Sequence, residues 1–333
     1  MLDGKRILVT GGTGSLGQVL VRRLLQHHDP QSVTVLSRDE AKQHYMRLEF
    51  KRLRAATDEV IFGDDRLRFV IGDVRDYASV TQSAKSADVI FCAAALKQVP
   101  SCEYFPWEAV RTNIQGAENL VRAIAENDLP VETVVGISTD KACKPVNVMG
   151  MTKAIQERVY INGNLRAPQT RFIAARYGNV IASRGSVVPL FLDQIEHGGP
   201  VTVTTADMTR FLLTLEDAVD TVLAAFAHAA PGETYIPRCP SAKMTDLAAC
   251  LIGDRPVEIA ITGIRPGEKV HEILLSDEEA SRTIHGSDGY YALRPMLPEL
   301  AEPVGNPAIS GALSSADSLM SRDDLADFLG TWL

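Results

Sequence analysis

Short runs of apolar and β-branched residues alternate with longer amphipathic stretches over the first 140 residues of the chain. The short runs are Arg6–Thr10, Val33–Leu36, Leu67–Ile71, Val89–Cys92 and Thr133–Ile137. The stretches with helical spacing between them are Leu16–His27, Glu40–Ala55, Tyr77–Ser83 and Glu108–Glu126. This alternation is typical of parallel strands joined by crossover helices that cover both faces of one sheet. It predicts an α/β protein with a doubly wound parallel sheet.

The second part of the chain follows a different pattern. A helix over Val148–Ile161 and a strand over Arg171–Arg176 continue the alternation, but from about Ile181 glycine and proline divide the chain into short segments. We therefore predict a Rossmann-like dinucleotide-binding domain over residues 1–180, which residues 206–235 also join. A smaller substrate-binding region would comprise residues 181–205 and 236–333.

Composition and charge exclude several classes of protein. The 333 residues are 45% apolar and 23% charged, which is close to the globular average and excludes a disordered or fibrous chain. The formal net charge of −8 and the lack of a clustered Lys/Arg run argue against a nucleic-acid partner. The first predicted strand starts too early to leave room for a signal peptide, and no stretch of ~18 apolar residues appears. We therefore expect a cytoplasmic protein that does not insert into a membrane.

The cysteines predict neither a disulfide framework nor a metal site. They are widely spaced, without a C-x-x-C pair, and no paired histidines stand at ligand spacing. Reduced and mostly buried thiols are expected at Cys92, Cys102, Cys143, Cys239 and Cys250. No metal is therefore predicted.

A glycine-rich loop lies between the first predicted strand and the first predicted helix. A loop that holds a pyrophosphate needs glycines where the backbone turns tightly, where it approaches phosphate oxygens, and where the helix packs on the strand. The helix N-terminus then adds unpaired N–H groups and a positive dipole end. The sequence thus predicts a dinucleotide-binding loop, with contacts from Gly11, Thr13, Gly14, Ser15, Leu16 and Gly17.

The end of the second predicted strand distinguishes between the two nicotinamide dinucleotides. An NAD-binding protein usually has Asp or Glu there to accept from the ribose 2′-OH. Here Ser37 and Arg38 follow the strand, and a hydroxyl and a guanidinium suit a 2′-phosphate. Lys42 would add a second cation, although a solvated surface lysine is an equal alternative. NADP is the predicted cofactor, and the adjacent Asp39 and Glu40 keep NAD open as the alternative.

Two further strand ends supply candidate cofactor contacts. After the third predicted strand, Asp73 would accept from the adenine amino group, with Val74 beside it. After the fourth, three small residues form a shelf on which a dinucleotide can lie against the backbone: Ala93, Ala94 and Ala95.

Several blocks of sequence carry a family resemblance. They are Ala93–Pro100 (AAALKQVP), Ser138–Lys141 (STDK), Arg176–Arg184 (RYGNVIASR), Met208–Phe211 (MTRF) and Arg265–Glu268 (RPGE). In these blocks the chain resembles the extended short-chain dehydrogenase/reductase superfamily and, within it, the UDP-N-acetylglucosamine 4,6-dehydratases that invert C5. Gln98 and Met149 resemble the dehydratase/5-epimerase branch that makes sugar precursors for capsule and O-antigen.

This resemblance implies a redox-neutral reaction. A hydride leaves C4 of the sugar for NADP, the resulting 4-ketone acidifies H5, a base removes H5, an acid protonates the departing C6 hydroxyl, and the hydride returns to C6. The acid and the base each need a pKa near neutrality. By resemblance, Asp140 is the C6 acid and Lys141 is the C5 base. Desolvation and the like charge of Lys153 are expected to lower the pKa of Lys141.

Met149 is a departure from the superfamily pattern. Most members have Tyr-x-x-x-Lys, in which the tyrosine takes the proton of the hydroxyl being oxidised, and a thioether cannot accept that proton. Lys153, one helical turn after Met149, would still bind the nicotinamide ribose. The C4 hydroxyl proton would then leave through Thr139, Lys141 or a water molecule.

Later segments would recognise a UDP-hexosamine. By resemblance, Lys97 faces the substrate and Asn179, at the end of the sixth predicted strand, contacts the diphosphate, although a surface lysine is an equal alternative for Lys97. Guanidinium groups bind phosphate oxygens bidentately, which makes candidates of Arg184, Arg210 and Arg265. Glu268 would accept from the uridine ribose hydroxyls.

Three functions compete at this point. The favoured one is NADP-dependent 4,6-dehydration of UDP-N-acetylglucosamine with C5 inversion, and a 4-epimerase or another UDP-hexosamine dehydratase of the same fold is the second. The third, suggested by the missing tyrosine, is a catalytically silent NADP-binding regulator. Asp140 and Lys141 argue against a simple 4-epimerase, which has no use for an acid–base pair at C5 and C6. A homo-oligomer, dimer or hexamer, is also expected, with interface residues on the helices at Glu108–Glu126 and Val148–Ile161.

Overall fold

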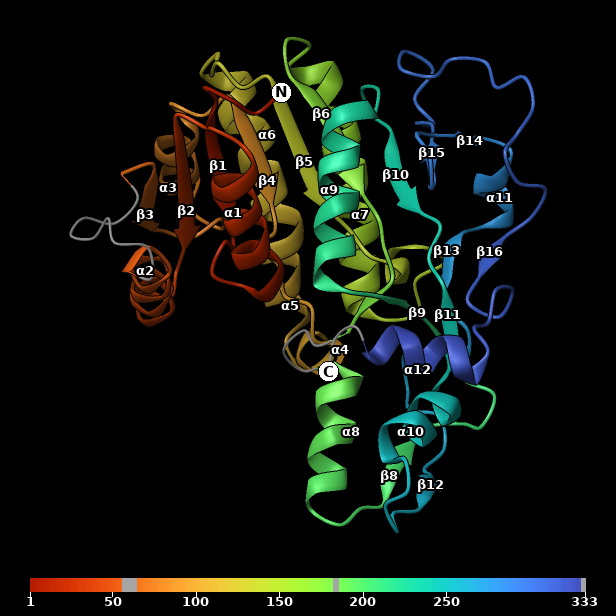
Figure 1. Ribbon diagram of the computed structural model, residues 1–333. Helices are drawn as coiled ribbons and strands as arrows, with labels where there is room; N and C mark the ends of the chain where they lie inside the picture. Colours follow the sequence, from red (N-terminus) through yellow and green to blue (C-terminus); the bar gives the residue numbers. More distant parts are fainter. Residues whose placement is uncertain (56–64, 182–185, 331–333) are drawn as a thin grey trace.

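The computed structural model describes residues 1–55, 65–181 and 186–330. Within these residues, one central sheet has nine strands in the order β14-β15-β10-β6-β5-β4-β1-β2-β3 (Figure 1). Seven of them run parallel: β1 (Arg6–Thr10), β2 (Ser32–Ser37), β3 (Leu67–Ile71), β4 (Val89–Cys92), β5 (Thr133–Ile137), β6 (Arg171–Ala175) and β10 (Thr234–Pro237). The first five match the predicted strands to within one residue at each end. The sheet confirms the predicted Rossmann-like α/β fold.

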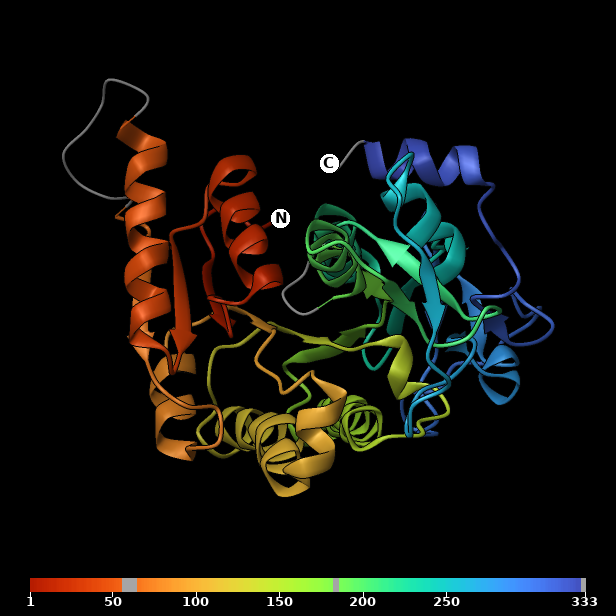
Figure 2. The same ribbon diagram turned by 90° about the horizontal axis from the view of Figure 1, so that it is seen from below.

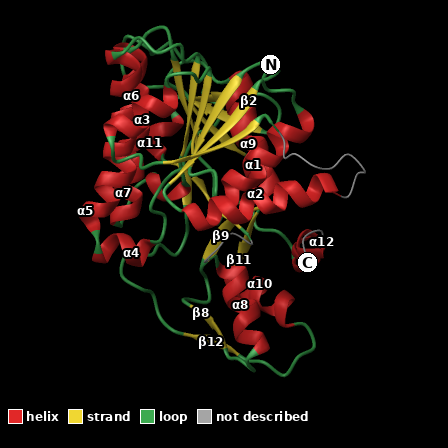
Figure 3. Cartoon of the chain, turned by 90° about the vertical axis from the view of Figure 1, so that its left-hand side faces the viewer, coloured by secondary structure: helices red, strands yellow, loops and turns green. Residues whose placement is uncertain are grey.

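Helices cover both faces of this sheet (Figure 3). One face carries α1 (Ser15–His27), α2 (Glu40–Ala55) and α9 (Leu215–His228), and the other carries α3 (Tyr77–Ala84), α6 (Gly116–Glu126) and α7 (Val148–Arg166). Two buried apolar clusters follow this division, one containing Leu20 and Val219 and the other Leu120 and Tyr160. Burial on both faces explains why the central strands are continuous apolar runs.

The helix predicted over Glu108–Glu126 is interrupted. The chain forms α4 (Val99–Tyr104), α5 (Pro106–Ala109) and a π-helical turn over Val110–Gln115 before α6 begins. The turn brings the fully buried Asn113 toward the loop after β4, where it donates to Leu96 O (3.0 Å) and accepts from Leu96 N (2.9 Å). The extra residue of the π turn thus fixes a loop that lines the pocket described below.

The smaller lobe has its own core and lies below the sheet in Figure 1. A sheet of β7 (Asn179–Val180), β9 (Thr209–Leu213) and β11 (Ser241–Lys243) connects it to the central sheet, and β8 (Val201–Val203) pairs with β12 (Ile259–Ile261). Buried side chains of α8 (Val187–Glu196), α10 (Met244–Ile252) and α12 (Arg322–Gly330) close this core. Figure 2 shows the lobe and the first strands of the sheet on opposite sides of the molecule.

Residues after 236 contribute to both parts. β15 (Tyr290–Leu293) pairs antiparallel with β10, and β14 (Thr283–His285) pairs with β15, so this hairpin extends the central sheet although it lies in the range predicted for substrate binding. β9, inside the range 206–235, pairs instead with β7 and β11. The central sheet therefore includes residues from both predicted ranges, 1–180 with 206–235 and 236–333. The domain boundaries stay a prediction.

Arg176 does not belong to β6, which ends at Ala175. Its guanidinium is buried and pairs with Glu157 of α7 (2.7 Å) and with Glu279 (2.8 Å) of the short helix α11 (Asp277–Ala280). Such a charge needs its partners, because a buried guanidinium left unpaired is strongly destabilising. The network ties the end of β6 to the C-terminal part of the chain.

None of the helices in the described part of the chain has the length and apolar character that a membrane crossing requires.

Candidate active site

A cavity of about 1380 Å³ opens at the carboxyl ends of the parallel strands, between the central sheet and the smaller lobe. This is the edge where open α/β sheets bind ligands, because the strand order reverses there and loops diverge. Its lining runs from the loop after β1 to the segment 265–272, which together form one continuous pocket with room for a dinucleotide and a second ligand.

The glycine-rich loop forms one end of the pocket. Gly11 has φ +67°, and a Cβ there would lie 2.6 Å from Ala94 N, so only glycine fits. At Gly17 a Cβ would lie 2.5 Å from Gly12 Cα, which explains how α1 can start close to β1. The predicted loop residues all line the cavity: Gly11, Thr13, Gly14, Ser15, Leu16 and Gly17. The backbone shape and the N-terminus of α1 fit a pyrophosphate.

The end of β2 lies beside this loop. Thr13 Oγ1 and Ser37 Oγ share a hydrogen bond of 2.8 Å, which joins the two segments. The Arg38 guanidinium lines the pocket with its side chain 51% exposed, and its Nη1 lies 3.7 Å from Asp73 Oδ2. Lys42 also lines the pocket and pairs with Asp39 (2.8 Å). Two cations thus line this side of the pocket, each beside a carboxylate.

The adenine side combines Asp73 and Val74 with the alanine shelf. Asp73 forms an ion pair with Arg75 (2.6 Å), which holds the Asp73 carboxylate in place at the pocket wall. The shelf residues Ala93, Ala94 and Ala95 also line the cavity. Small side chains here leave the strand-end backbone open to a flat ligand, and the set of contacts fits a nicotinamide dinucleotide.

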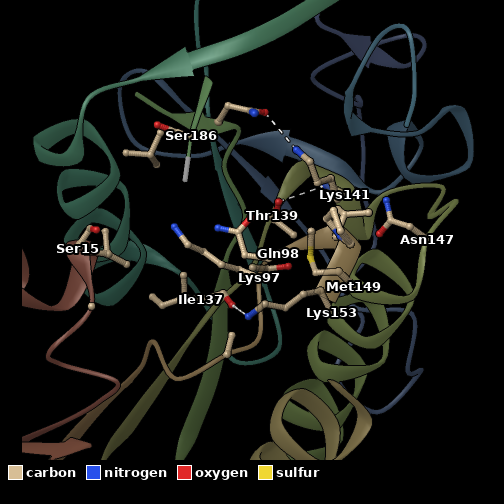
Figure 4. A pocket seen from close by; sticks show the side chains of 18 of the residues that line it. Ser15, Lys97, Gln98, Ile137, Thr139, Lys141, Asn147, Met149, Lys153 and Ser186 are labelled. Atoms are coloured by element: carbon tan, nitrogen blue, oxygen red, sulfur yellow. Dashed lines mark hydrogen bonds between the residues drawn. The ribbon is translucent and has the colours of Figure 1, made fainter. Parts of the chain in front are cut away.

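Lys153 and Met149 project from the first turns of α7 (Figure 4). Lys153 Nζ donates to Ile137 O (2.7 Å) and Gln156 Oε1 (2.7 Å), at the end of β5. Desolvation lowers the pKa of Lys153 to about 8. Met149 is buried against Cys102 and lines the pocket. Met149 therefore puts an apolar side chain at the position where the Tyr-x-x-x-Lys pattern has tyrosine.

The segment after β5 places Thr139 and Lys141 in the lining of the pocket, whereas Asp140, the predicted acid, lies outside that lining and beside them. Asp140 is fully buried, and its Oδ1 accepts from Thr139 Oγ1 (2.8 Å) and from Lys141 Nζ (3.0 Å). Lys141 Nζ also donates to Asn179 Oδ1 (3.2 Å) and lies 3.3 Å from Glu272 Oε1. Glycine at position 150 is required, since a Cβ would lie 2.2 Å from Lys141 O. The start of α7 thus packs directly under this segment.

The expected direction of the pKa of Lys141 is wrong. Desolvation does lower it, but the carboxylates of Asp140 and Glu272 outweigh that effect, and the pKa of Lys141 is raised. Lys153 makes its contacts on Ile137 and Gln156 instead. In the free protein Lys141 is an ammonium ion at neutral pH.

Most predicted substrate residues line the same cavity: Lys97, Asn179, Arg210, Arg265 and Glu268. Arg184 lies outside the described residues. Asn179 stands in β7 and not at the end of β6, because the chain leaves the central sheet after Ala175 and pairs with β9. Desolvation lowers the pKa of Lys97, which fits a side chain facing into the pocket. The structure thus brings together residues that lie up to about 170 positions apart.

Sequence reasoning missed Glu272. Its side chain is 3% exposed and lies near three cations: Lys141, Arg210 (3.8 Å) and Lys269 (4.0 Å). A signal was present, because Lys269 and Glu272 directly continue the block Arg265–Glu268. Nothing in the local sequence, however, indicates that this segment reaches the end of β5.

The fold and this pocket define an extended short-chain dehydrogenase/reductase. Residues 7–294 match the model of one family, described as polysaccharide biosynthesis protein, and the chain belongs to this family.

Its relatives carry two names. The chain is 41% identical over 300 residues to a UDP-N-acetylglucosamine 4,6-dehydratase (inverting) of Campylobacter jejuni, covering 89% of this chain and 85% of that protein. It is 42% identical over 297 residues to a UDP-glucose 4-epimerase of Rickettsia conorii, covering 87% of this chain and 83% of that protein. Overall identity therefore does not separate a dehydratase from an epimerase.

Solved structures agree with the fold. Pen from Bacillus thuringiensis superposes with a TM-score of 0.88 at 32% identity, covering 99% of this chain and 98% of that one. DesIV, a dTDP-glucose 4,6-dehydratase of Streptomyces venezuelae, has a TM-score of 0.67 at 22% identity, covering 80% and 86%. The second likeness supports the fold alone.

Proposed function

We propose that the protein catalyses the NADP-dependent 4,6-dehydration of UDP-N-acetylglucosamine with inversion at C5, and that its product is a precursor of surface polysaccharide. The observation that carries this proposal is the pair Asp140 and Lys141, whose side chains lie 3.0 Å apart, with Lys141 lining the pocket and Asp140 buried beside it. Dehydration needs an acid at O6 and a base at C5, and these two side chains supply one of each.

A bound nicotinamide dinucleotide would supply the hydride acceptor for C4 and, once reduced, the hydride donor for C6. Asp140 would supply the proton for the departing C6 hydroxyl through the Thr139 hydroxyl, which lines the cavity and contacts Asp140 Oδ1. Lys141, as the free amine, removes H5. Lys141 would reach the free-amine form by giving its ammonium proton to water as the pocket fills, while Asp140 would gain its proton from O4 during C4 oxidation. After Lys141 returns the proton taken from C5, one proton from water would re-form its ammonium group.

Thr139 offers a path for the C4 hydroxyl proton in place of the missing tyrosine. Its Oγ1 donates to Asp140 Oδ1 (2.8 Å), so a proton accepted by Thr139 from O4 can be passed on to Asp140. That transfer would restore the acid that O6 consumes, which balances the protons released and used. Lys153 would hold the nicotinamide ribose, and Met149 would pack beside it.

NADP is proposed over NAD because of the charges at the end of β2. Arg38 and Lys42 both line the pocket near Thr13 and Ser37. Lys42 pairs closely with Asp39 (2.8 Å), whereas Arg38 is 3.7 Å from Asp73 and half-exposed, so its guanidinium would be the main partner of a 2′-phosphate.

The opposite end of the pocket would bind the UDP moiety. Arg210 and Arg265, which line the cavity, would pair with the diphosphate, and Glu268 would pair with the uridine ribose. Lys97 would contact the sugar side. Asn179 would donate to the diphosphate through its amide nitrogen, since its amide oxygen accepts from Lys141.

A UDP-hexose 4-epimerase is the second candidate, favoured by the names of several relatives. A simple 4-epimerase moves a proton and a hydride at C4 only, and Asp140 and Lys141 would then have no task. A silent NADP-binding regulator would need neither group in a pocket open to a second ligand. The acid–base pair therefore favours dehydration.

We also propose a homo-oligomer, a dimer or a hexamer. Large apolar side chains are exposed just before the predicted interface helix at Glu108–Glu126, at Tyr104 of α4 (83% exposed) and Trp107 of α5 (68%), and within α7 at Met151 and Ile155. Burying them between copies would be favourable. Sedimentation should give a multiple of the chain mass at micromolar concentration, and a monomer there would contradict this.

The function is tested by incubating the protein with UDP-N-acetylglucosamine and NADP and recording proton NMR spectra. We expect a new C6 methyl resonance from the 4-keto-6-deoxy product, with no net change in cofactor oxidation state. Formation of the C4 epimer alone would support the epimerase instead.

A further inference from the structure

Glu272 is a buried carboxylate in the pocket that neither the cofactor site nor the proposed acid–base pair requires. It precedes β13 (Ile273–Leu275) in the C-terminal part of the chain. Its backbone is fixed on both sides by Ser315, which accepts from Glu272 N (3.0 Å) and donates to Glu272 O (2.8 Å). The position of this carboxylate is therefore built into the fold.

Lys141 Nζ has three neighbouring oxygens, each from a different part of the chain: Asp140 Oδ1 (3.0 Å), Asn179 Oδ1 (3.2 Å) and Glu272 Oε1 (3.3 Å). An ammonium group has three N–H donors and no acceptor, so it matches three oxygens. A neutral amine has a lone pair, which would face one of these oxygens. The arrangement therefore suits the charged form of Lys141 and opposes its action as a base.

The other charges near this group do not alter that conclusion. Arg210, on β9, and Lys269 are the facing cations; both pair with Glu272, and Lys269 Nζ also donates to Cys143 O (2.6 Å). Glu272 Oε2 is buried without a hydrogen-bond partner among the described residues. Glu272 is thus held at the floor by charge, with Lys141 as its closest cation.

We propose that Glu272 is a positioning residue for Lys141. The Glu272 carboxylate holds the ammonium group of Lys141 in place and keeps that group protonated until the pocket is filled. This deepens the proposed function and rests on it for the role of Lys141 as base. A sugar that fills the pocket displaces water from around Lys141. Loss of water destabilises charged groups more than neutral ones, so the ammonium form of Lys141 loses stability relative to the free amine. Release of the proton would then coincide with the presence of H5.

The test measures the protonation of Lys141 without using activity. Purified full-length protein is treated briefly with acetic anhydride at several pH values between about 7 and 9, a range below the ordinary lysine pKa, and acetylation at Lys141 is quantified by mass spectrometry. Glu272→Gln should speed this labelling about tenfold at a given pH, because an adjacent opposite charge shifts a pKa by about one unit or more. Glu268→Gln, an identical change in the same segment, should leave the labelling rate of Lys141 unmoved.

A second variant, Glu272→Asp, keeps the proposal testable if Glu272→Gln does not fold. Glu272→Asp keeps the charge but withdraws the carboxylate by one methylene, so the labelling rate should lie between those of the parent protein and Glu272→Gln. Unchanged labelling in a folded Glu272→Gln or Glu272→Asp protein overturns the proposal.

Kinetics provide a separate readout. In Glu272→Gln, the acid limb of the kcat/KM profile for dehydration should move to lower pH, a change that loss of packing alone would not cause. If UDP-N-acetylglucosamine is not dehydrated by the parent protein while the labelling shift is present, the proposed function fails and the role of Glu272 stands.

Discussion

The two ends of the pocket are built in different ways. The dinucleotide end is built largely from backbone in the segments that follow β1, β2, β3 and β4, with glycine required at positions 11 and 17 by close approach. The substrate end is made of charged side chains from segments far apart in the chain, such as Lys141, Arg210 and Glu272. One end depends on shape, and the other depends on the balance of charge among distant elements.

This difference indicates how each end should respond to substitution. A change in the backbone-built end should alter dinucleotide affinity and leave proton chemistry in place. A change in the charge-built end should alter proton transfer and leave the dinucleotide bound. Each prediction below tests that separation, beginning with the largest expected effect.

Removing the proposed base should slow the proton-transfer steps without weakening dinucleotide binding. Lys141→Ala is expected to slow dehydration and C5 hydrogen exchange by about 10²–10⁴-fold, the usual contribution of a general base. NADP⁺ affinity, measured by titration calorimetry, should remain near that of the parent protein. Near-normal C5 exchange in this variant would assign the base to another group.

Adding one methyl group to the loop should have the opposite effect. Gly11→Ala forces a Cβ to 2.6 Å from Ala94 N at φ +67°. A left-handed backbone at a non-glycine residue costs about 1–2 kcal/mol, before the clash is counted, so we expect dinucleotide binding to weaken about tenfold to a hundredfold. The rate of turnover at saturating cofactor should fall far less than in Lys141→Ala. Unaltered affinity would show that the loop does not hold the cofactor.

The choice of cofactor should depend on one guanidinium. Arg38→Ala is expected to reduce the preference for NADP⁺ over NAD⁺ by about tenfold, as befits a charge-assisted contact at a half-exposed position. Dissociation constants for both dinucleotides measure this directly. Equal binding of NAD⁺ and NADP⁺ by the parent protein would contradict the interpretation of the end of β2.

Restoring the tyrosine should have the smallest effect. Met149→Tyr is expected to raise the rate of C4 oxidation modestly, since it adds a proton acceptor but must fit into a buried site at a packing cost of about 1–3 kcal/mol. Single-turnover measurements of hydride transfer would detect the change. An unchanged or lower rate would mean that Thr139, Lys141 or water already takes this proton.

The sequence allowed the dinucleotide end to be predicted because its determinants are local. Strand periodicity and the glycine spacing of the first loop lie within a few residues of each other, and β1 ends where it was expected. The π turn before α6 could not be predicted, because it depends on Asn113 meeting Leu96 in the folded chain.

The charge balance at the substrate end was less predictable. Lys141 was correctly placed in the pocket, but the direction of its pKa was not, since Glu272 lies 131 positions away along the chain and reaches Lys141 only through the tertiary fold. Likewise Arg176, expected at the end of a strand, serves a buried ion-pair network whose partner Glu279 comes from the C-terminal part.

The central claim is that Asp140 and Lys141 move protons at C6 and C5 of a UDP-hexosamine. It is tested most directly by running the reaction in heavy water with UDP-N-acetylglucosamine deuterated at C4 and analysing the product by NMR and mass spectrometry. If these two groups act as proposed, the product carries solvent deuterium at C5 and the original C4 deuterium in the C6 methyl group. A product with inverted C4, no hydrogen exchange at C5 and an intact C6 hydroxyl would contradict it.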